Sequence, residues 1–268
     1  MGFYLGSNKI DNHMILFTMI EDNFITGELT NYTGDNNIIK DNAFMYCSNL
    51  TSVSFPNCSH IGSHAFYSCF NLTSISFPNC YCIERYAFYC CSGLTSVNFP
   101  SCSSVYDTVF GYCSNLTSVN FPNCTFIEHN AFEECVNLVS INFPKCSRIN
   151  SEVFIRCSNL TSVSFPNCSS IGSSAFRDCK NLMSITLPSC KRIARDAFYK
   201  CYNLISVNFT GVSSIPVLES ASIFYSTPIG GYSTSAGRYG SVYVPASLYS
   251  SFLTATYWSV ISSRIVSV

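Results

Sequence analysis

Residues 61–80 read IGSHAFYSCFNLTSISFPNC, and this stretch returns along the chain with a fixed period of 22 residues. Three residues after each repeated leucine comes Val or Ile, and two residues later comes Phe or, once, Leu. This alternation predicts a short β-strand with one buried face, and proline ends it in seven of the eight repeats. The repeated leucines are Leu50, Leu72, Leu94, Leu116, Leu138, Leu160, Leu182 and Leu204.

A second apolar limb follows each strand. A cysteine lies three residues after the Phe position in seven repeats, and Ile or Val lies three residues further on, from Ile61 to Ile215. Ile61, Ala65 and Phe66 have a spacing that predicts a helical or 3₁₀ turn, too short for a long helix. One coil cannot bury its own apolar side, so eight stacked coils sharing one continuous core are the expected fold.

The pattern LxxVxFxxCxxI resembles the leucine-rich-repeat motif, with cysteine at its Asn/Cys position, and the full repeat resembles the BspA-like bacterial branch. The resemblance covers about residues 39–215. The period here is 22 where that branch commonly shows about 23, and Phe often replaces Leu. The resemblance implies a leucine-rich-repeat solenoid, a right-handed superhelix of parallel short β-strands with short helical or 3₁₀ return limbs.

Two dissimilar ends flank the repeats. Residues 1–37 are expected to form an N-terminal cap, residues 38–215 the eight 22-residue repeats, and residues 216–268 a C-terminal loop and cap. Residues 220–240 are rich in Ser, Thr, Gly and Pro and predict a loop, whereas residues 246–261 predict a helix over the last coil. The stretch VYVPASLYSSFLTATYWSVISSRIV, residues 242–266, resembles the terminal cap of such proteins in gut Firmicutes.

Composition narrows the functional classes. Only 11% of the 268 residues are charged and the formal net charge is −1, so no overall field attracts nucleic acid or an anionic membrane. No apolar run is long enough to span a bilayer, and the sequence begins without the basic and apolar regions of a secretory signal. We expect a monomer with a protein or glycan ligand. An extracellular or cell-surface location is what the BspA-like resemblance implies.

The chain has 17 cysteines, and 15 of these cysteines fall in two repeat columns; Cys82 and Cys90 lie outside the columns. They could bind zinc, form disulfides or remain as free thiols. Zinc ligation is disfavoured because Cys80 and Cys82 are one residue apart and the remaining spacing follows the repeat. Disulfides between coils are within reach, but regular ladders point side chains in one direction. Buried, mostly reduced thiols are therefore expected, with no metal site and no cofactor.

No catalytic constellation is recognisable, and the sequence is not expected to be an enzyme. Nucleophilic catalysis requires a positioned histidine, and none of the four histidines has a matching partner motif. Carboxylates such as Glu133 and Glu134 occupy variable positions that are typical of a solvated face. A basic cluster in the late coils is interrupted by Asp178 and Asp196, which disfavours a nucleic-acid stripe.

A ligand-binding surface is instead expected on the strands, which line the concave side in this architecture. The residues that flank the Val column are mostly Ser and Asn, which offer hydrogen bonds but few anchors. The column before them changes from Thr in the early coils to Met183 and Ile205 in the late coils. The candidate ligand-binding residues are Met183, Thr186, Tyr202, Ile205 and Asn208.

Two functional classes remain open. The first is a cell-surface or secreted module that adheres to a protein or glycan, as the resemblance implies. The second is a structural or assembly component of a surface appendage or phage tail, in which the caps or the convex face pack against other subunits.

Overall fold

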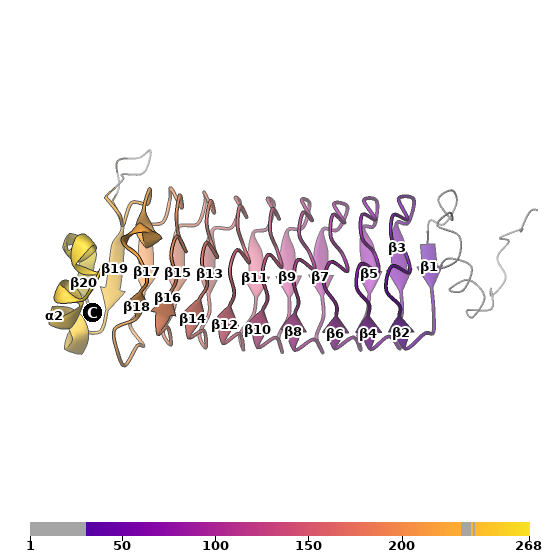
Figure 1. Ribbon diagram of the computed structural model, residues 1–268, viewed down its shortest axis with the longest axis horizontal. Helices are drawn as coiled ribbons and strands as arrows, with labels where there is room; N and C mark the ends of the chain where they lie inside the picture. The colour runs from indigo at the N-terminus through magenta and orange to yellow at the C-terminus, as the bar shows by residue number, and fades with distance from the viewer. Residues whose placement is uncertain (1–30, 232–236, 238) are drawn as a thin grey trace, which may run out of the picture.

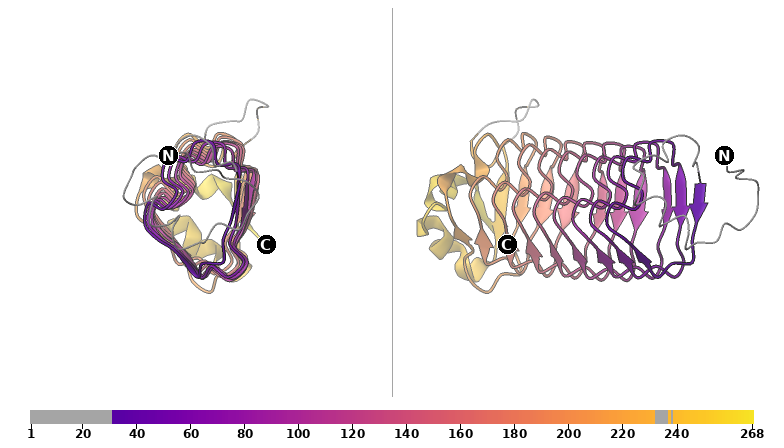
Figure 2. Two further views of the ribbon diagram at one scale, coloured as in Figure 1. Left: turned by 90° about the vertical axis from the view of Figure 1, so that its right-hand side faces the viewer. Right: turned by 45° about the vertical axis from the view of Figure 1, so that its right-hand side comes forward.

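A computed structural model describes residues 31–231, 237 and 239–268 of the chain as a row of parallel coils (Figure 1). Residues 1–30 of the expected N-terminal cap lie outside the described residues. Viewed end-on, the coils superpose on one closed outline (Figure 2). The row is nearly straight, so the strand face expected to be concave is close to flat (Figure 1).

Each coil contributes one three-residue strand and one two-residue strand, on different sides of the outline. The three-residue strands are β1 Asn31–Thr33, β3 Ser52–Ser54, β5 Ser74–Ser76, β7 Ser96–Asn98, β9 Ser118–Asn120, β11 Ser140–Asn142, β13 Ser162–Ser164, β15 Ser184–Thr186 and β17 Ser206–Asn208. The two-residue strands are β2 Ile38–Ile39, β4 His60–Ile61, β6 Cys82–Ile83, β8 Ser104–Val105, β10 Phe126–Ile127, β12 Arg148–Ile149, β14 Ser170–Ile171, β16 Arg192–Ile193 and β18 Val217–Leu218.

Strand pairing follows the sequence period. β3 pairs with β5 in parallel and places Val53 opposite Ile75, one 22-residue step apart. The three-residue strands divide into separate sheets between β5 and β7 and again between β11 and β13. The predicted parallel solenoid is confirmed.

The repeated apolar residues form the core. The repeated leucines, both phenylalanine columns and both cysteine columns are buried. Rings stack from coil to coil: Phe44 and Phe66 have centroids 5.0 Å apart and planes 4° apart, and Phe66 stacks on Phe88 at 5.0 Å and 5°. Since each fully buried large side chain stabilises the fold by about 1.5–3 kcal/mol, these columns dominate its stability.

The column cysteines are buried, as predicted, and 14 of the 15 thiols donate a hydrogen bond to a backbone carbonyl among the described residues. In the second column Cys69 donates to the carbonyl of Phe44 at 3.0 Å, and Cys91 donates to that of Phe66 at 3.0 Å. In the first column Cys58 donates to the carbonyl of His60 at 3.2 Å. A protonated thiol thus satisfies a backbone carbonyl inside each tight coil.

The return limbs are consecutive turns where the sequence predicts a helical or 3₁₀ segment. Bonds of 3₁₀ type do occur, as from Ala65 N to the carbonyl of Gly62 at 3.3 Å. However, His64 and Ser68 take left-handed backbone angles, with φ of 56° and 58°. Their N–H groups donate to carbonyls of the next coil at 3.1 and 2.8 Å. Bonds between coils therefore offset the roughly 1–2 kcal/mol cost of each left-handed residue.

The repeat continues beyond the expected boundaries. At the N-terminal side, β1 places Tyr32 opposite Val53, and the Tyr32 ring contacts Phe44 and Phe55 with centroids 5.4 and 5.3 Å apart. At the other end, Ile215 was expected to close the Ile column, but β18 places Leu218 opposite Ile193. Three extra residues in that coil shift the register, and Ile215 is only partly buried.

The C-terminal cap combines two further strands with short helices: η1 Ala221–Phe224, β19 Ser241–Val244, η2 Ala246–Leu248, α2 Tyr249–Thr254, η3 Ser259–Arg264 and β20 Ile265–Ser267. The expected helix over residues 246–261 is thus three short pieces. The Trp258 ring packs against Phe209 and Phe252 with centroids 5.5 and 5.0 Å away. Its indole N–H donates to the carbonyl of Pro216 at 2.8 Å. This ring covers the apolar end of the last coil.

Candidate binding surfaces

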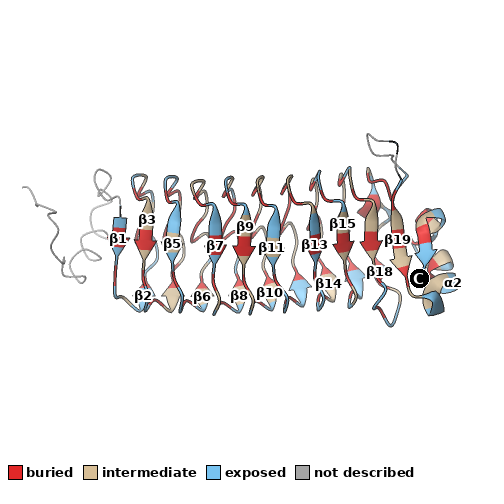
Figure 3. Ribbon diagram, turned by 180° about the vertical axis from the view of Figure 1, so that it is seen from behind, coloured by how far each residue is buried: buried red, intermediate tan, exposed pale blue. Residues whose placement is uncertain are grey.

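The three-residue strands present an uncharged polar face. In most of these strands the middle residue is buried and its two neighbours are more exposed (Figure 3). In the middle coils the outward asparagines bond one another. The Asn120 amide donates to Asn98 Oδ1 at 2.7 Å, and the Asn142 amide donates to Asn120 Oδ1 at 2.6 Å. A partner would have to replace these bonds, so the middle of the face offers little net affinity.

The strand face is hollowed where β11 and β13 belong to different sheets. Ile141, at the centre of β11, is only half-buried there. A shallow groove of about 520 Å³ is lined by Ile141, Asn142, Phe143, Pro144, Ser162, Val163, Ser164, Pro166, Ser184 and Thr186. The groove combines hydroxyl and amide groups with two proline rings, a mixture that suits an extended polar ligand.

The five predicted binding residues lie near the C-terminal end of this face. Thr186 lines the groove and pairs in register with Asn208. Ile205 N donates to the carbonyl of Met183 at 3.0 Å, so these residues are neighbours on adjacent coils. Met183 is 47% exposed and Tyr202, three residues before Ile205, is 44% exposed. The late coils thus carry apolar side chains in solvent beside a polar groove.

Two of these five residues, Ile205 and Asn208, are less accessible to a ligand than the sequence suggests. Ile205 is half-buried, and the backbone at Gly240 lies against its main chain. Asn208 is half-buried and its Oδ1 accepts a hydrogen bond from Thr210 N at 2.8 Å. Met183 and Tyr202 are therefore the exposed anchors of this group.

An aromatic cluster on the early return limbs was not foreseen. It consists of six rings linked by centroid distances of 4.9–5.7 Å: Tyr46, His64, Tyr67, Tyr86, Tyr89 and Tyr112. Tyr46 and Tyr112 are 54% and 38% exposed. The signal in the sequence was the tyrosine at the variable positions after the buried Phe, as in AFYSC and AFYCC.

The late return limbs carry a charge ladder in place of these rings. Positions one period apart hold Glu134, Arg156, Asp178 and Lys200, whose signs alternate. Arg156 Nη1 lies 2.7 Å from Glu134 Oε1, and a depression of about 370 Å³ lies over this part of the ladder. Arg177 lies over the Tyr199 ring at 4.8 Å from its centroid. Because opposite charges alternate, the ladder is not a uniformly basic stripe for nucleic acid.

Ser63 and His64 come closest to a nucleophile and base. Ser63 Oγ lies 2.8 Å from His64 Nδ1, and burial followed by the charge of Arg85 lowers the pKa of His64. Asp41, however, accepts a bond from the backbone N–H of Ser63 at 2.8 Å. Within the described residues, the hydrogen bonds of this pair therefore do not include the carboxylate that orients the histidine in a catalytic triad.

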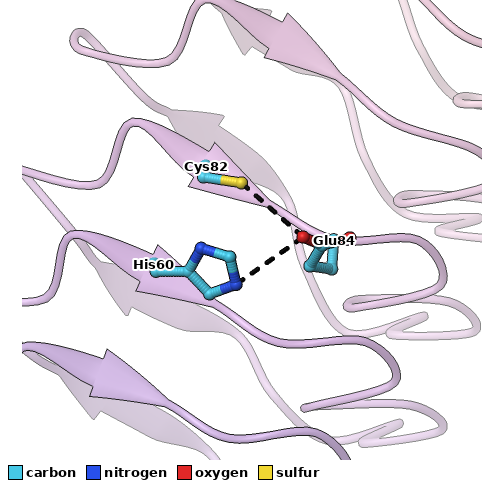
Figure 4. A group of neighbouring side chains, drawn as sticks. All are labelled: His60, Cys82 and Glu84. Atoms are coloured by element: carbon cyan, nitrogen blue, oxygen red, sulfur yellow. Dashed lines mark hydrogen bonds and ion pairs between the residues drawn. The ribbon is translucent and has the colours of Figure 1, made fainter.

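Among the residues that the structure describes, one group of side chains could hold a metal ion. His60 belongs to β4, Cys82 begins β6 and Glu84 directly follows β6, and their ligand atoms all lie within 4.8 Å of one another (Figure 4). The sequence disfavours a metal site because the cysteines lack ligand spacing along the chain. Coil stacking instead unites residues that are one period apart.

The sequence matches the profile described as BspA type leucine rich repeat region, in six copies, over residues 37–161 and 147–229. These ranges cover most of the chain. The chain belongs to the BspA-type leucine-rich-repeat family. No curated protein matches the sequence.

Solved leucine-rich-repeat structures resemble this BspA-type chain. A leucine-rich-repeat protein of T. pallidum is 25% identical, with 72% of this chain and 74% of that one covered and a TM-score of 0.36. A leucine-rich cell surface protein of Faecalibacterium prausnitzii is 21% identical over 90% and 88%, with a TM-score of 0.36. The pneumococcal vaccine antigen PcpA is 15% identical over 90% and 88%, with a TM-score of 0.38.

In the part of this BspA-type chain that the structure describes, no helix has the length and apolar character needed to cross a membrane.

Proposed function

We propose that this chain is a non-enzymatic binding module, secreted or held at a cell surface, that recognises a protein or glycan through the strand face of its late coils. The observation that carries this proposal is the exposure of Met183 and Tyr202 beside the groove that contains Thr186. Membership in the BspA-type family supports a surface location and a binding role.

The physical reason favours the late coils over the middle ones. An apolar side chain that leaves water on binding contributes affinity directly, whereas a solvated hydroxyl first exchanges its bond to water. Met183 and Ile205 provide the apolar part, and Thr186 and Asn208 provide nearby polar groups. A sugar ring or an extended peptide, each with apolar and polar edges, fits this arrangement.

The test begins with purified chain probed on glycan and host-protein arrays. For an identified partner, Met183→Ser combined with Tyr202→Ser should raise Kd by about tenfold or more, because both anchors are lost. The matched control changes two exposed tyrosines of the early return limbs, Tyr46→Ser and Tyr112→Ser. Normal binding by the late-coil variant with loss in the control would move the site to the aromatic cluster and refute the proposal.

An assembly role is the competing function. In that case the purified chain would form ordered multimers through its ends or its return-limb face, and the arrays would give no partner. Light scattering with the parent chain and with Arg156→Ala, which alters the return-limb face, distinguishes the two.

A further inference from the structure

The group formed by His60, Cys82 and Glu84 lies along the two-residue strands (Figure 4). These strands occupy a different side of the coils from the three-residue strands of the proposed binding face (Figure 2). β4 and β6 pair with His60 opposite Cys82, so these side chains are neighbours on consecutive coils. Glu84 follows Cys82 by two residues and therefore points to the same side of the chain. Neither the sequence spacing nor the proposed function accounts for this juxtaposition.

The ligand atoms are already almost as close as a metal ion requires. His60 Nε2 lies 3.7 Å from Glu84 Oε1, and Cys82 Sγ lies 3.9 Å from the same oxygen. Around a tetrahedral zinc ion, bonds of about 2.0–2.3 Å place neighbouring ligand atoms about 3.3–3.8 Å apart. All three residues are half-buried, so their side chains can adjust by the small remaining distance and are accessible to solvent ions.

The fold itself does not require these residues. Cys82 is outside both cysteine columns, and its equivalents in the next coils are Ser104, Phe126 and Arg148. Glu84 is replaced by Tyr106 one period later. Residues at these positions vary freely in type, so the combination of imidazole, thiol and carboxylate in one place is not a consequence of core packing.

The geometry points to a zinc site: we propose that His60, Cys82 and Glu84 bind one Zn²⁺ ion and connect the first two repeats. Nitrogen, sulfur and oxygen donors together suit zinc, whereas Mg²⁺ and Ca²⁺ prefer oxygen alone. Three protein ligands leave the fourth position to water or to a donor from a partner.

Binding of the ion releases the proton of the Cys82 thiol, since the thiolate is the form that binds metal. In the structure this thiol donates to Glu84 Oε1 at 3.9 Å, so the two ligand groups already face each other.

The direct test is a titration of chelator-treated, reduced chain with Zn²⁺ in competition with a chromophoric chelator. We expect one ion per folded chain. Cys82→Ser and His60→Gln should each weaken binding by about tenfold or more. The matched control is Cys90→Ser, because Cys90 is the other half-buried cysteine outside the columns. It should bind Zn²⁺ like the parent chain.

Absorption spectroscopy with Co²⁺ tests independently whether the Cys82 thiolate is a ligand. Co²⁺ in place of Zn²⁺ should give a thiolate charge-transfer absorption in the parent chain and in Cys90→Ser, but not in Cys82→Ser. The melting temperature should rise with added Zn²⁺ only where the site is intact, because an ion that binds only the folded state stabilises it. Zinc affinity unchanged by Cys82→Ser, or a Co²⁺ spectrum without the thiolate band, would overturn the proposal. Neither result bears on the late-coil binding surface.

Discussion

The early and late return limbs have the same backbone but opposite surface chemistry. Tyr112 and Glu134 are one period apart and both adopt left-handed angles, with φ of 60° and 56°. One belongs to a cluster of stacked rings and the other to a ladder of alternating charges. The buried Phe and Cys columns continue unchanged beneath both. The core and the bonds between coils therefore determine the fold, and the outward positions are free to differ.

The largest expected effect concerns the cysteines that both halves share. Burial raises the pKa of Cys168 to about 11 and that of Cys124 and Cys190 to about 12. An unfolded thiol has a pKa of about 8.5. The folded state therefore keeps protons that the unfolded state loses, so this stability is complete below about pH 8.5 and falls as pH rises towards 11–12. Each such thiol removes about 1.4 kcal/mol per pH unit in that window.

We expect the chain to unfold under reducing conditions as pH rises above about 9, measured by circular dichroism. Cys124→Ala should make the pH dependence shallower even if it lowers stability at pH 7. As a control, a thiol reagent at neutral pH should label mainly Cys82 and Cys90 in the folded chain and many more cysteines after denaturation. A chain still folded at pH 11, or one with few titratable thiols when denatured, would contradict buried, reduced columns.

The early and late halves share one core of stacked phenylalanine rings, so equivalent substitutions in the two halves should have similar effects. Phe88 and Phe154 are fully buried and stack between neighbours, with centroids 5.0–5.5 Å apart. Replacing either by Ala should destabilise the chain by about 3–5 kcal/mol, because the ring and its stacking contacts are lost. Phe70→Ala is the control, since Phe70 is 48% exposed.

Hydrogen exchange is the suitable measurement, because long repeat arrays can unfold in parts. Exchange should accelerate most in the coils that flank the substituted ring. A much smaller effect at one of the two sites would show that the halves differ in their cores as well as on their surfaces.

The difference between the repeated core and the variable outward positions explains which features could be predicted from the sequence. The strands, the buried columns and the parallel register all follow from a pattern repeated every 22 residues. The turn geometry could not be predicted because left-handed residues such as His64 and Glu134 share no residue type; their N–H groups bond to the next coil. The displacement of Ile215 by Leu218 results from three extra residues that local spacing does not reveal.

The surfaces were harder to predict for a related reason. Met183 and Tyr202 were identified because they interrupt a polar column, and both are exposed. The six-ring cluster and the group of His60, Cys82 and Glu84 were missed because their members belong to different coils. Such groups become visible only when equivalent positions of consecutive repeats are placed side by side.

The smallest effects should separate the two return-limb surfaces directly. Tyr67 stacks on Tyr89 with centroids 5.0 Å apart and is half-buried, so Tyr67→Ala should cost more than the roughly 0.5–1.5 kcal/mol of the ring pair alone. Glu134→Gln removes an ion pair whose Arg156 side chain is 53% exposed, and such surface pairs contribute about 0–1 kcal/mol.

Salt provides the discriminating measurement, because screening weakens exposed ion pairs far more than ring contacts. Melting temperatures at low ionic strength and in about 1 M NaCl should bring Glu134→Gln close to the parent chain at high salt. The deficit of Tyr67→Ala should persist, since loss of a ring contact is not screened. If instead the Glu134→Gln deficit were independent of salt, the carboxylate would act through its hydrogen bond to Arg156 more than through its charge. Short-range contacts would then stabilise both return-limb surfaces, and the contrast in charge between them would contribute little to stability.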